Sequence, residues 1–259
     1  MKHLILACAV LATAVAAPAY AQENEDLRVR VGIGAQVRPE FVGAEDREVG
    51  PLFDIDVARG DKPFQIEAPD DSFGLRLVNE GGFVFGPAAN IAPSRKERDV
   101  GAPVGKVKTT LEVGGFAEYL LTDSFRLRGQ LLKGVNGHEG LVGSIGADAI
   151  FRDGDRYAAT LGPRLLWSDS RYQLAYFGVS PAASLAAGLP VYRPGGGVHA
   201  VALAGGLTTQ LGPRWGLFGY ARAERLVGDA ARSPIVREYG SRNQLSAGLG
   251  LSYVFRVER

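Results

Sequence analysis

Cysteine is almost absent from this chain, and the single one, Cys8, lies close to its first residue. Residues 1–21 combine a basic start at Lys2, an apolar run and the small-residue pattern Ala19-Tyr20-Ala21. These features predict a secretory signal peptide that is cut after Ala21. The mature chain would then contain no cysteine, which excludes disulfide bonds and thiol chemistry.

An excess of charge of one sign is missing, and so are long apolar runs. Loss of Lys2 with the signal peptide would leave 28 basic against 28 acidic residues, so we expect no nucleic-acid partner. Beyond residue 21, no run approaches the ~18 consecutive apolar residues of a membrane helix. If the chain spans a membrane, it does so as a barrel, because only helices and closed barrels satisfy their backbone hydrogen bonds in lipid.

Histidine is scarce, and His138 and His199 are the two candidates for a catalytic base in the mature chain. A hydrolase needs a nucleophile, a base and an orienting group, and no serine near these histidines lies in a nucleophile-elbow pattern. The two histidines also lack the spacing of metal ligands. We therefore expect no catalytic residues, no metal and no cofactor, unless folding brings a serine and an acid to one of these histidines.

The chain does contain a repeated alternation of apolar with small or polar residues. In residues 244–257, Leu245, Leu249 and Phe255 belong to an apolar face, and glycine, serine and glutamine occupy the other face. Ordinary strands have ~5–6 residues, whereas outer-membrane strands run ~10 residues with one face toward lipid. The length therefore predicts an all-β fold over residues 22–259, an antiparallel transmembrane β-barrel in contact with outer-membrane lipid.

The alternation predicts about twelve strands, an even number as in single-chain bacterial barrels. They cover residues 27–37, 52–58, 63–79, 83–91, 111–121, 125–131, 141–151, 157–167, 172–180, 199–207, 215–224 and 244–257. Residues 63–79 form either one bent strand or two short ones. In this count the loop at 92–106 falls on the opposite side from the long loops at 181–197 and 227–242, so about ten or fourteen strands stay open.

Charged side chains on the narrow faces of the strands are expected to point into the barrel. If the first two strands form a hairpin, Asp56 lies opposite Arg28 or Arg30, because facing residues share one side of a sheet. The same reasoning places Glu118 against Arg128 on the pair at 111–121 and 125–131. Opposite signs on neighbouring strands favour a lumen closed by paired side chains over a charged pore.

Several segments together resemble the MipA/OmpV family. They are PEFVG at 39–43, YFGVS at 176–180, GLPVY at 188–192, GDAARSPIV at 228–236 and GLGLSYVF at 248–255. The resemblance implies an outer-membrane barrel that acts as a scaffold between a murein lytic transglycosylase and a penicillin-binding protein. It also implies a second role, since other members are surface antigens or adhesins.

Four residues of these segments, Asp229, Ser233, Pro234 and Tyr192, are candidates for a partner or ligand site. The simpler interpretation is a structural turn, held by an Asx-type hydrogen bond from Asp229 and a rigid Ser-Pro step. We therefore predict a noncatalytic scaffold in the outer membrane. The alternatives are a small-solute channel, a surface adhesin and a soluble periplasmic β-sandwich.

Overall fold

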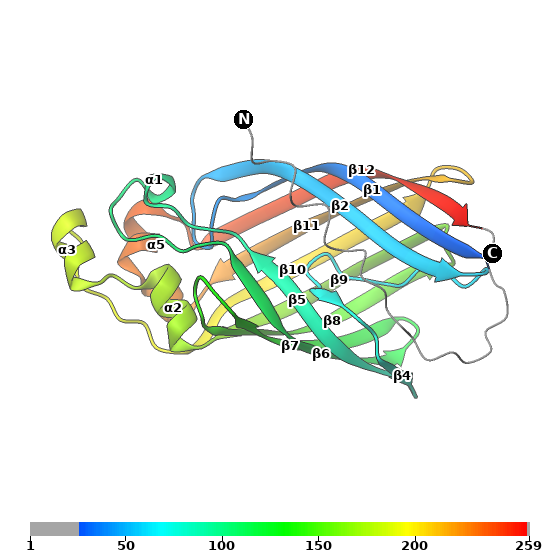
Figure 1. The fold of residues 1–259 in the computed structure, drawn as a ribbon, viewed down its shortest axis with the longest axis horizontal. Coiled ribbons are helices and arrows are strands. Elements are labelled where there is room, and N and C mark those ends of the chain that lie inside the picture. Colours follow the sequence, from blue (N-terminus) through cyan, green and yellow to red (C-terminus); the bar gives the residue numbers. More distant parts are fainter. Residues whose placement is uncertain (1–25, 258–259) are drawn as a thin grey trace.

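The computed structural model describes residues 26–257, so the predicted signal peptide at 1–21 lies outside the described residues. The strands form an antiparallel 12-stranded sheet (Figure 1). They are β1 (Leu27–Pro39), β2 (Arg47–Arg59), β3 (Phe73–Gly74), β4 (Val78–Glu80), β5 (Phe83–Ala92), β6 (Thr110–Thr122), β7 (Phe125–Gly134), β8 (Leu141–Asp153), β9 (Tyr157–Ser168), β10 (Gly197–Gln210), β11 (Trp215–Leu226) and β12 (Asn243–Val257).

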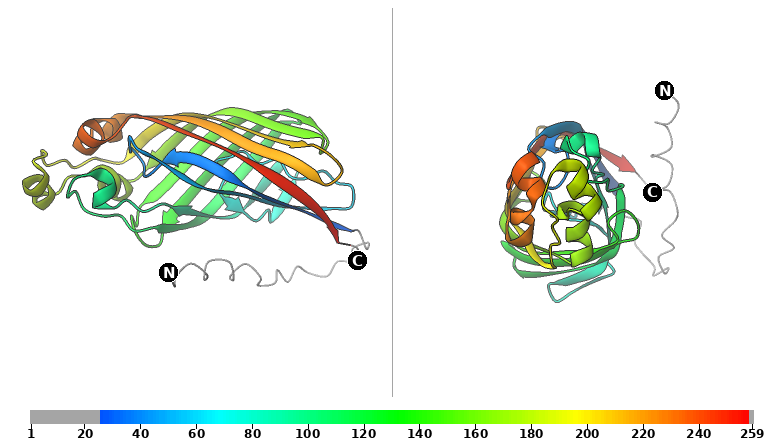
Figure 2. Two further views of the ribbon diagram at one scale, coloured as in Figure 1. Left: turned by 90° about the horizontal axis from the view of Figure 1, so that it is seen from above. Right: turned by 90° about the vertical axis from the view of Figure 1, so that its left-hand side faces the viewer.

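The sheet curls into a barrel in which the first and last strands are neighbours (Figure 2). Its order is β2-β1-β12-β11-β10-β9-β8-β7-β6-β5-β3, and β4 also pairs with β5. The pairing of β1 with β12 extends from Leu27 opposite Val257 to Val37 opposite Ala247. The two ends of the sheet are therefore β2 on one side and the short β3 and β4 on the other.

The outward face of the sheet is apolar, and the inward face is polar. Ile33, Phe53 and Ile145 are each 66% exposed on the outside, whereas Arg126 and Asp148 inside the barrel are 1% exposed. This distribution is the reverse of a soluble protein and typical of an outer-membrane barrel, whose apolar band contacts lipid. The predicted transmembrane barrel is confirmed, and the soluble sandwich is excluded because its apolar faces would have to pack on each other.

Short helices gather at one end of the barrel (Figures 1 and 2). They are α1 (Glu97–Val100), α2 (Ser170–Phe177), α3 (Pro181–Ala187), α4 (Gly228–Arg232) and α5 (Pro234–Tyr239). Within residues 26–257 none of the helices has the length and apolar character needed to cross a membrane. The long loops pack together there, and Val100, Val179, Ala183 and Ile235 share one buried cluster. We call this helical end the loop cap.

The strand predicted at 172–180 is wrong, because most of this segment forms α2. Asp169 caps the helix by accepting a hydrogen bond from Tyr172 N at 2.9 Å. Tyr172, Tyr176 and Phe177 are buried, and residues four apart fit one face of a helix as well as a period of two. Without this extra strand, the loop at 92–106 lies at the same end as the other long loops, and the conflict in the predicted count disappears.

Residues 63–79, predicted as wall strands, divide between the wall and the interior. From Phe73 onward the chain pairs with β5, and Leu75 and Leu77 continue this pairing between β3 and β4. Residues 60–72, here called the lumen segment, instead run inside the barrel. The prediction failed for the lumen segment because its position depends on ion pairs with distant wall residues.

Candidate functional site

The lumen segment crosses the barrel from β2 toward the opposite wall. At its start, Arg28 Nε donates to Gly60 O at 2.8 Å. Phe64 N then donates to Asp155 Oδ1, in the turn between β8 and β9, at 2.8 Å. Farther along, Pro69 reaches β10, where a Cβ on Gly206 would lie 3.2 Å from Pro69 Cδ. The lumen segment is thus fastened to several parts of the wall.

Two adjacent aspartates of the lumen segment pair with arginines of the wall. Asp71 Oδ2 lies 2.7 Å from Arg126 Nη1, and Asp71 Oδ1 lies 3.2 Å from Arg128 Nε. Asp70 Oδ2 lies 3.0 Å from Arg164 Nε. Because these groups are largely buried, removal of one partner would leave an uncompensated charge inside the barrel. The aspartates therefore hold the lumen segment in place.

Wall carboxylates complete the charge network behind these arginines. Asp148 lies 2.7 Å from both Arg126 Nη2 and Arg164 Nη2. Glu118 lies 3.2 Å from Arg128 Nη1 and 3.1 Å from Arg76 Nη2. Both carboxylates are 1% exposed in their side chains. Mixed signs at close range cancel the field that an open, charged pore would need.

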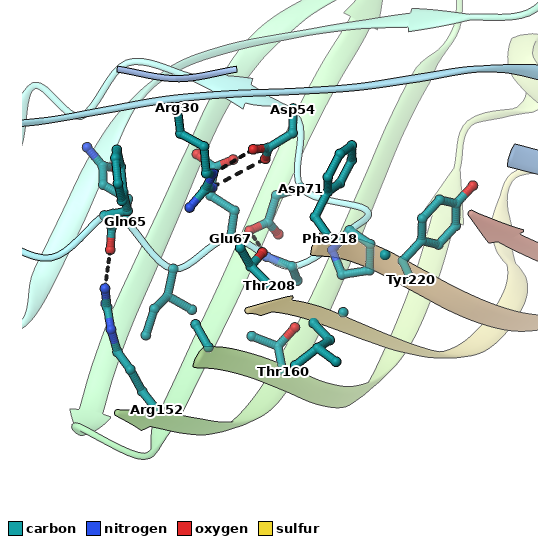
Figure 3. Close-up of a pocket in the computed structure, with 18 of the residues that line it drawn as sticks. Arg30, Asp54, Gln65, Glu67, Asp71, Arg152, Thr160, Thr208, Phe218 and Tyr220 are labelled. Atoms are coloured by element: carbon teal, nitrogen blue, oxygen red, sulfur yellow. Dashed lines mark hydrogen bonds and ion pairs between the residues drawn. The ribbon is translucent and has the colours of Figure 1, made fainter. Parts of the chain in front are cut away.

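On the first hairpin, Arg30 forms the predicted ion pair with Asp56, whereas Arg28 pairs with a residue outside the hairpin. Arg30 lies opposite Asp56 in the register and 3.5 Å from its carboxylate. A shorter contact of 2.6 Å joins Arg30 to Asp54 (Figure 3). Arg28 instead pairs with Asp155 at 2.8 Å, across the lumen. The sequence pattern gave no sign of this contact, since Asp155 lies in a turn.

The other predicted pair, Glu118 and Arg128, lies directly opposite in the register of β6 and β7. Sequence reasoning missed Asp148 and Arg164, although both occupy inward positions that an alternation in their strands would indicate. It also missed Asp70 in the lumen segment. No periodic signal marks that residue, because it belongs to a turn of irregular backbone.

Two cavities flank the lumen segment. The first, of about 220 Å³, includes Arg30, Glu67 and Phe218 in its lining (Figure 3). The second, of about 400 Å³, extends toward the loop cap and is lined by residues that include His199 and Arg222. Pro69 and Asp71 line both cavities. The lumen segment therefore divides the interior of the barrel.

The four residues predicted as a loop site meet at one junction of the loop cap. Tyr192 Oη donates to Asp229 O at 2.9 Å, and Asp229 Oδ2 accepts from Gly195 N at 2.7 Å. Ser233 is fully buried and donates from Oγ to Phe177 O at 2.7 Å. Pro234 begins α5. These contacts stabilise the fold of the loops and leave Ser233 inaccessible to a partner.

Asp229 makes the loop junction sensitive to acid. The hydrogen bond from Gly195 N, together with the ion pair to Arg232, lowers the pKa of Asp229. A lowered pKa stabilises the folded loop above the ordinary aspartate value of about 4, and the stabilisation is lost as the pH falls through the lowered pKa. We expect pepsin to cleave wild type within residues 188–197 only after the pH has fallen through the lowered pKa of Asp229.

The matched variant Asp229→Asn should permit cleavage of the same loop at every pH where pepsin is active. Mass spectrometry of the fragments identifies the cut, and heat-dependent gel mobility shows that the barrel is folded. Equal cleavage of wild type and Asp229→Asn across the pH range would contradict the role of the carboxylate.

Both histidines are buried and hydrogen-bonded. Ser168 Oγ lies 3.0 Å from His199 Nδ1, and His138 Nε2 lies 2.9 Å from Glu112 Oε1. Ser168 is 0% exposed, and no carboxylate of residues 26–257 hydrogen-bonds to His199. The Ser168–His199 contact therefore links β9 to β10 inside the wall. Nowhere in the described part of the chain do three or more histidine, cysteine or acidic residues form a group suited to a metal.

Three solved outer-membrane proteins are among the structures that this chain resembles. An outer membrane channel from Pseudomonas putida F1 matches at 9% identity and a TM-score of 0.43, covering 93% of this chain and 100% of the other. The outer membrane channel DcaP of Acinetobacter baumannii matches at 7% and 0.40, covering 91% and 99%. The translocator domain of autotransporter NalP from Neisseria meningitidis matches at 15% and 0.39, covering 91% and 90%.

Sequence comparison is more informative. A search of curated proteins finds no significant match. The family model described as MltA-interacting protein MipA matches residues 31–255, which is nearly the whole described chain. The match includes the loop segments and the last strand on which the predicted resemblance rests. Together with the barrel fold and its apolar outer face, this match shows that the chain belongs to the MipA family of outer-membrane proteins.

Proposed function

We propose that this chain is an interaction scaffold of the outer membrane that binds a murein lytic transglycosylase and couples it to a penicillin-binding protein. The observation that carries the proposal is the lumen segment, which Asp70 and Asp71 fasten across the barrel. A barrel whose interior is divided by the lumen segment is suited to binding other proteins through its exposed turns and loops. The family description, which names an MltA-interacting protein, supports the choice of partner.

The short turns are the surface that we assign to the enzyme. Outer-membrane barrels have short periplasmic turns and longer extracellular loops, and murein lies on the periplasmic side. By this rule the turns at 81–82, 123–124, 154–156 and 211–214 face the periplasm, and the loop cap faces outward. Arg156 and Arg214 are exposed in these turns and offer basic contacts for an enzyme.

A binding assay with matched charge reversals tests the proposal. The full-length protein in detergent is immobilised and exposed to a purified murein lytic transglycosylase. We expect the double variant Arg156→Glu/Arg214→Glu to lose retention of the enzyme, because both side chains lie in the turns. The control Arg237→Glu, an exposed position of the loop cap, should retain the enzyme as wild type does.

Two outcomes would contradict the proposal. If wild type does not retain the transglycosylase, this chain is not its scaffold. If only Arg237→Glu loses retention, the binding surface is the loop cap, and the surface-adhesin alternative gains support. Heat-dependent gel mobility of each variant shows that the barrel is folded in every arm.

A further inference from the structure

The barrel wall has a seam between β2 and the β3–β4 region. Within residues 26–257, no backbone hydrogen bond joins these two ends of the sheet. On the outer face, Phe53 and Ile55 on one side of the seam and Phe73 and Leu77 on the other are 66–82% exposed. Open sheet edges are unfavourable in lipid because their polar groups lack partners. A barrel in a membrane therefore needs something to pair with this seam.

The hydrogen bonds at each side show which backbone groups face the seam. Gly60 N donates to Asp26 O, so even-numbered residues of β2 face β1 and odd-numbered residues such as Ile55 face the seam. Leu75 N donates to Pro87 O, so between Phe73 and Leu77 the odd-numbered residues face β5 and the even-numbered residues face the seam. A strand that closes the seam must match both patterns.

The direction of a closing strand is also fixed. Following the antiparallel neighbours around the sheet shows that β2 runs in the same direction as β3 and β4. A strand placed between them must run the opposite way to both. The lumen segment does so, because it leads from the end of β2 to the start of β3. Counting β3 and β4 as one strand, because both pair with β5, the wall has 11 strands, and adding the lumen segment would give 12, an even number as in single-chain bacterial barrels.

Turns at both ends of the lumen segment already set its register. Lys62 N donates to Arg59 O, which forms a two-residue hairpin turn that pairs Phe64 with Val57. Asp71 N donates to Ala68 O, and this turn fits a four-residue loop at 68–71 between the lumen segment and β3. Such a loop would pair Phe64 with Leu75. In this register, the backbone groups of even-numbered residues in the lumen segment face the odd-numbered residues of β2. The backbone groups of its odd-numbered residues face the even-numbered residues near β3.

The side chains of the lumen segment alternate as a wall strand requires. Phe64 and Ile66 would join the apolar outer face, and Gln65 and Glu67 would point into the lumen. At present Phe64 is 4% exposed inside the barrel, below the guanidinium groups of Arg28 and Arg30, each 4.9 Å from its ring centroid. An apolar lipid-facing pattern is thus held in a polar interior.

We infer that the lumen segment exchanges between the lumen and the seam, and that in the seam position the barrel conducts small anions. Movement into the seam would withdraw Asp70 and Asp71 from the wall arginines that they now contact. Arg126, Arg128 and Arg164 would then face a water-filled interior with fewer opposing carboxylates. Such an interior favours anions over cations.

Engineered disulfides test the two positions, because the chain has no cysteine beyond Cys8. Phe64 and Leu75 now lie inside and outside the wall, but in the seam register their Cα atoms would be about 4.5 Å apart, within disulfide range. We expect Phe64→Cys/Leu75→Cys to oxidise in lipid bilayers. The locked protein should carry a steady anion-selective current in a potassium chloride gradient. A reductant should make that current intermittent, because the lumen segment can then return to the lumen.

The matched control locks the other position. Pro69→Cys/Gly206→Cys joins sites that are adjacent in the present arrangement, and the oxidised form should stay silent at every voltage. If the Phe64 pair does not fold, Ile66→Cys/Phe73→Cys reports the same register. Failure of both seam pairs to cross-link in a folded barrel, a silent seam-locked protein or a cation-selective current would overturn the inference. The transglycosylase-binding assay is independent of these results.

Discussion

Replacing Arg126 with methionine is expected to lower the free energy of unfolding by about 3–5 kcal/mol, the range for breaking a buried charge pair. Arg126 is 1% exposed and lies within 3.3 Å of three carboxylates, those of Asp71, Glu118 and Asp148. Methionine fills much of the same volume but leaves this negative charge without its central cation. The substitution also removes the ion pair between Arg126 and Asp71 that holds the lumen segment to the wall.

Urea unfolding in lipid vesicles, followed by the fluorescence of Trp167 and Trp215, measures this effect. The control is Arg156→Met, since Arg156 pairs with Asp153 at 3.5 Å but is 82% exposed in its side chain. An exposed pair of this kind contributes about 0–1 kcal/mol. Equal stability of Arg126→Met and Arg156→Met would show that the buried network does not stabilise the barrel.

The variant Leu249→Arg should destabilise the membrane-inserted barrel by about 2–4 kcal/mol, as expected for a cation on the lipid face near the midplane. Leu249 lies near the middle of β12, opposite Ala35 of β1 and Gly219 of β11. It is 60% exposed on the outward face. Its replacement places a guanidinium group in hydrocarbon, where few polar partners exist.

Leu249→Phe is the matched control, because it keeps the site apolar and should unfold in urea within about 0.5 kcal/mol of wild type. The same vesicle assay serves both variants. If Leu249→Arg were as stable as Leu249→Phe, the outward face of β12 would not contact lipid. That result would contradict the membrane-barrel interpretation of the whole sheet.

The wall of the barrel was predictable because each strand carries its own signal. Alternation is local, so strands such as 244–257 were recognised without knowledge of their neighbours. The register of β6 and β7 followed from keeping their apolar faces on one side, and it set Glu118 opposite Arg128. Local patterns fail where two structures share them, as at 172–180, where buried tyrosines four residues apart fit α2 equally well.

The interior of the barrel was less predictable because its contacts are nonlocal. Arg28 and its partner Asp155 are 127 positions apart in the sequence. Asp70 and Asp71 lie in a turn, and nothing in the local pattern indicates that they reach across to wall arginines. The sequence predicts wall strands over residues 63–79, and the observed placement of the lumen segment inside the barrel depends on those distant arginines.

The pairing of β1 with β12 has a consequence for biogenesis. During export β1 emerges before the other described strands, yet its partner β12, which ends at Val257, emerges after all of them. Contacts between residues so distant in sequence form slowly, because a long loop must close, at a cost in chain entropy, before the stabilising contacts can form. The edge of β1 therefore stays unpaired through most of translocation. Periplasmic chaperones that shield exposed strands would be needed for this chain throughout that interval.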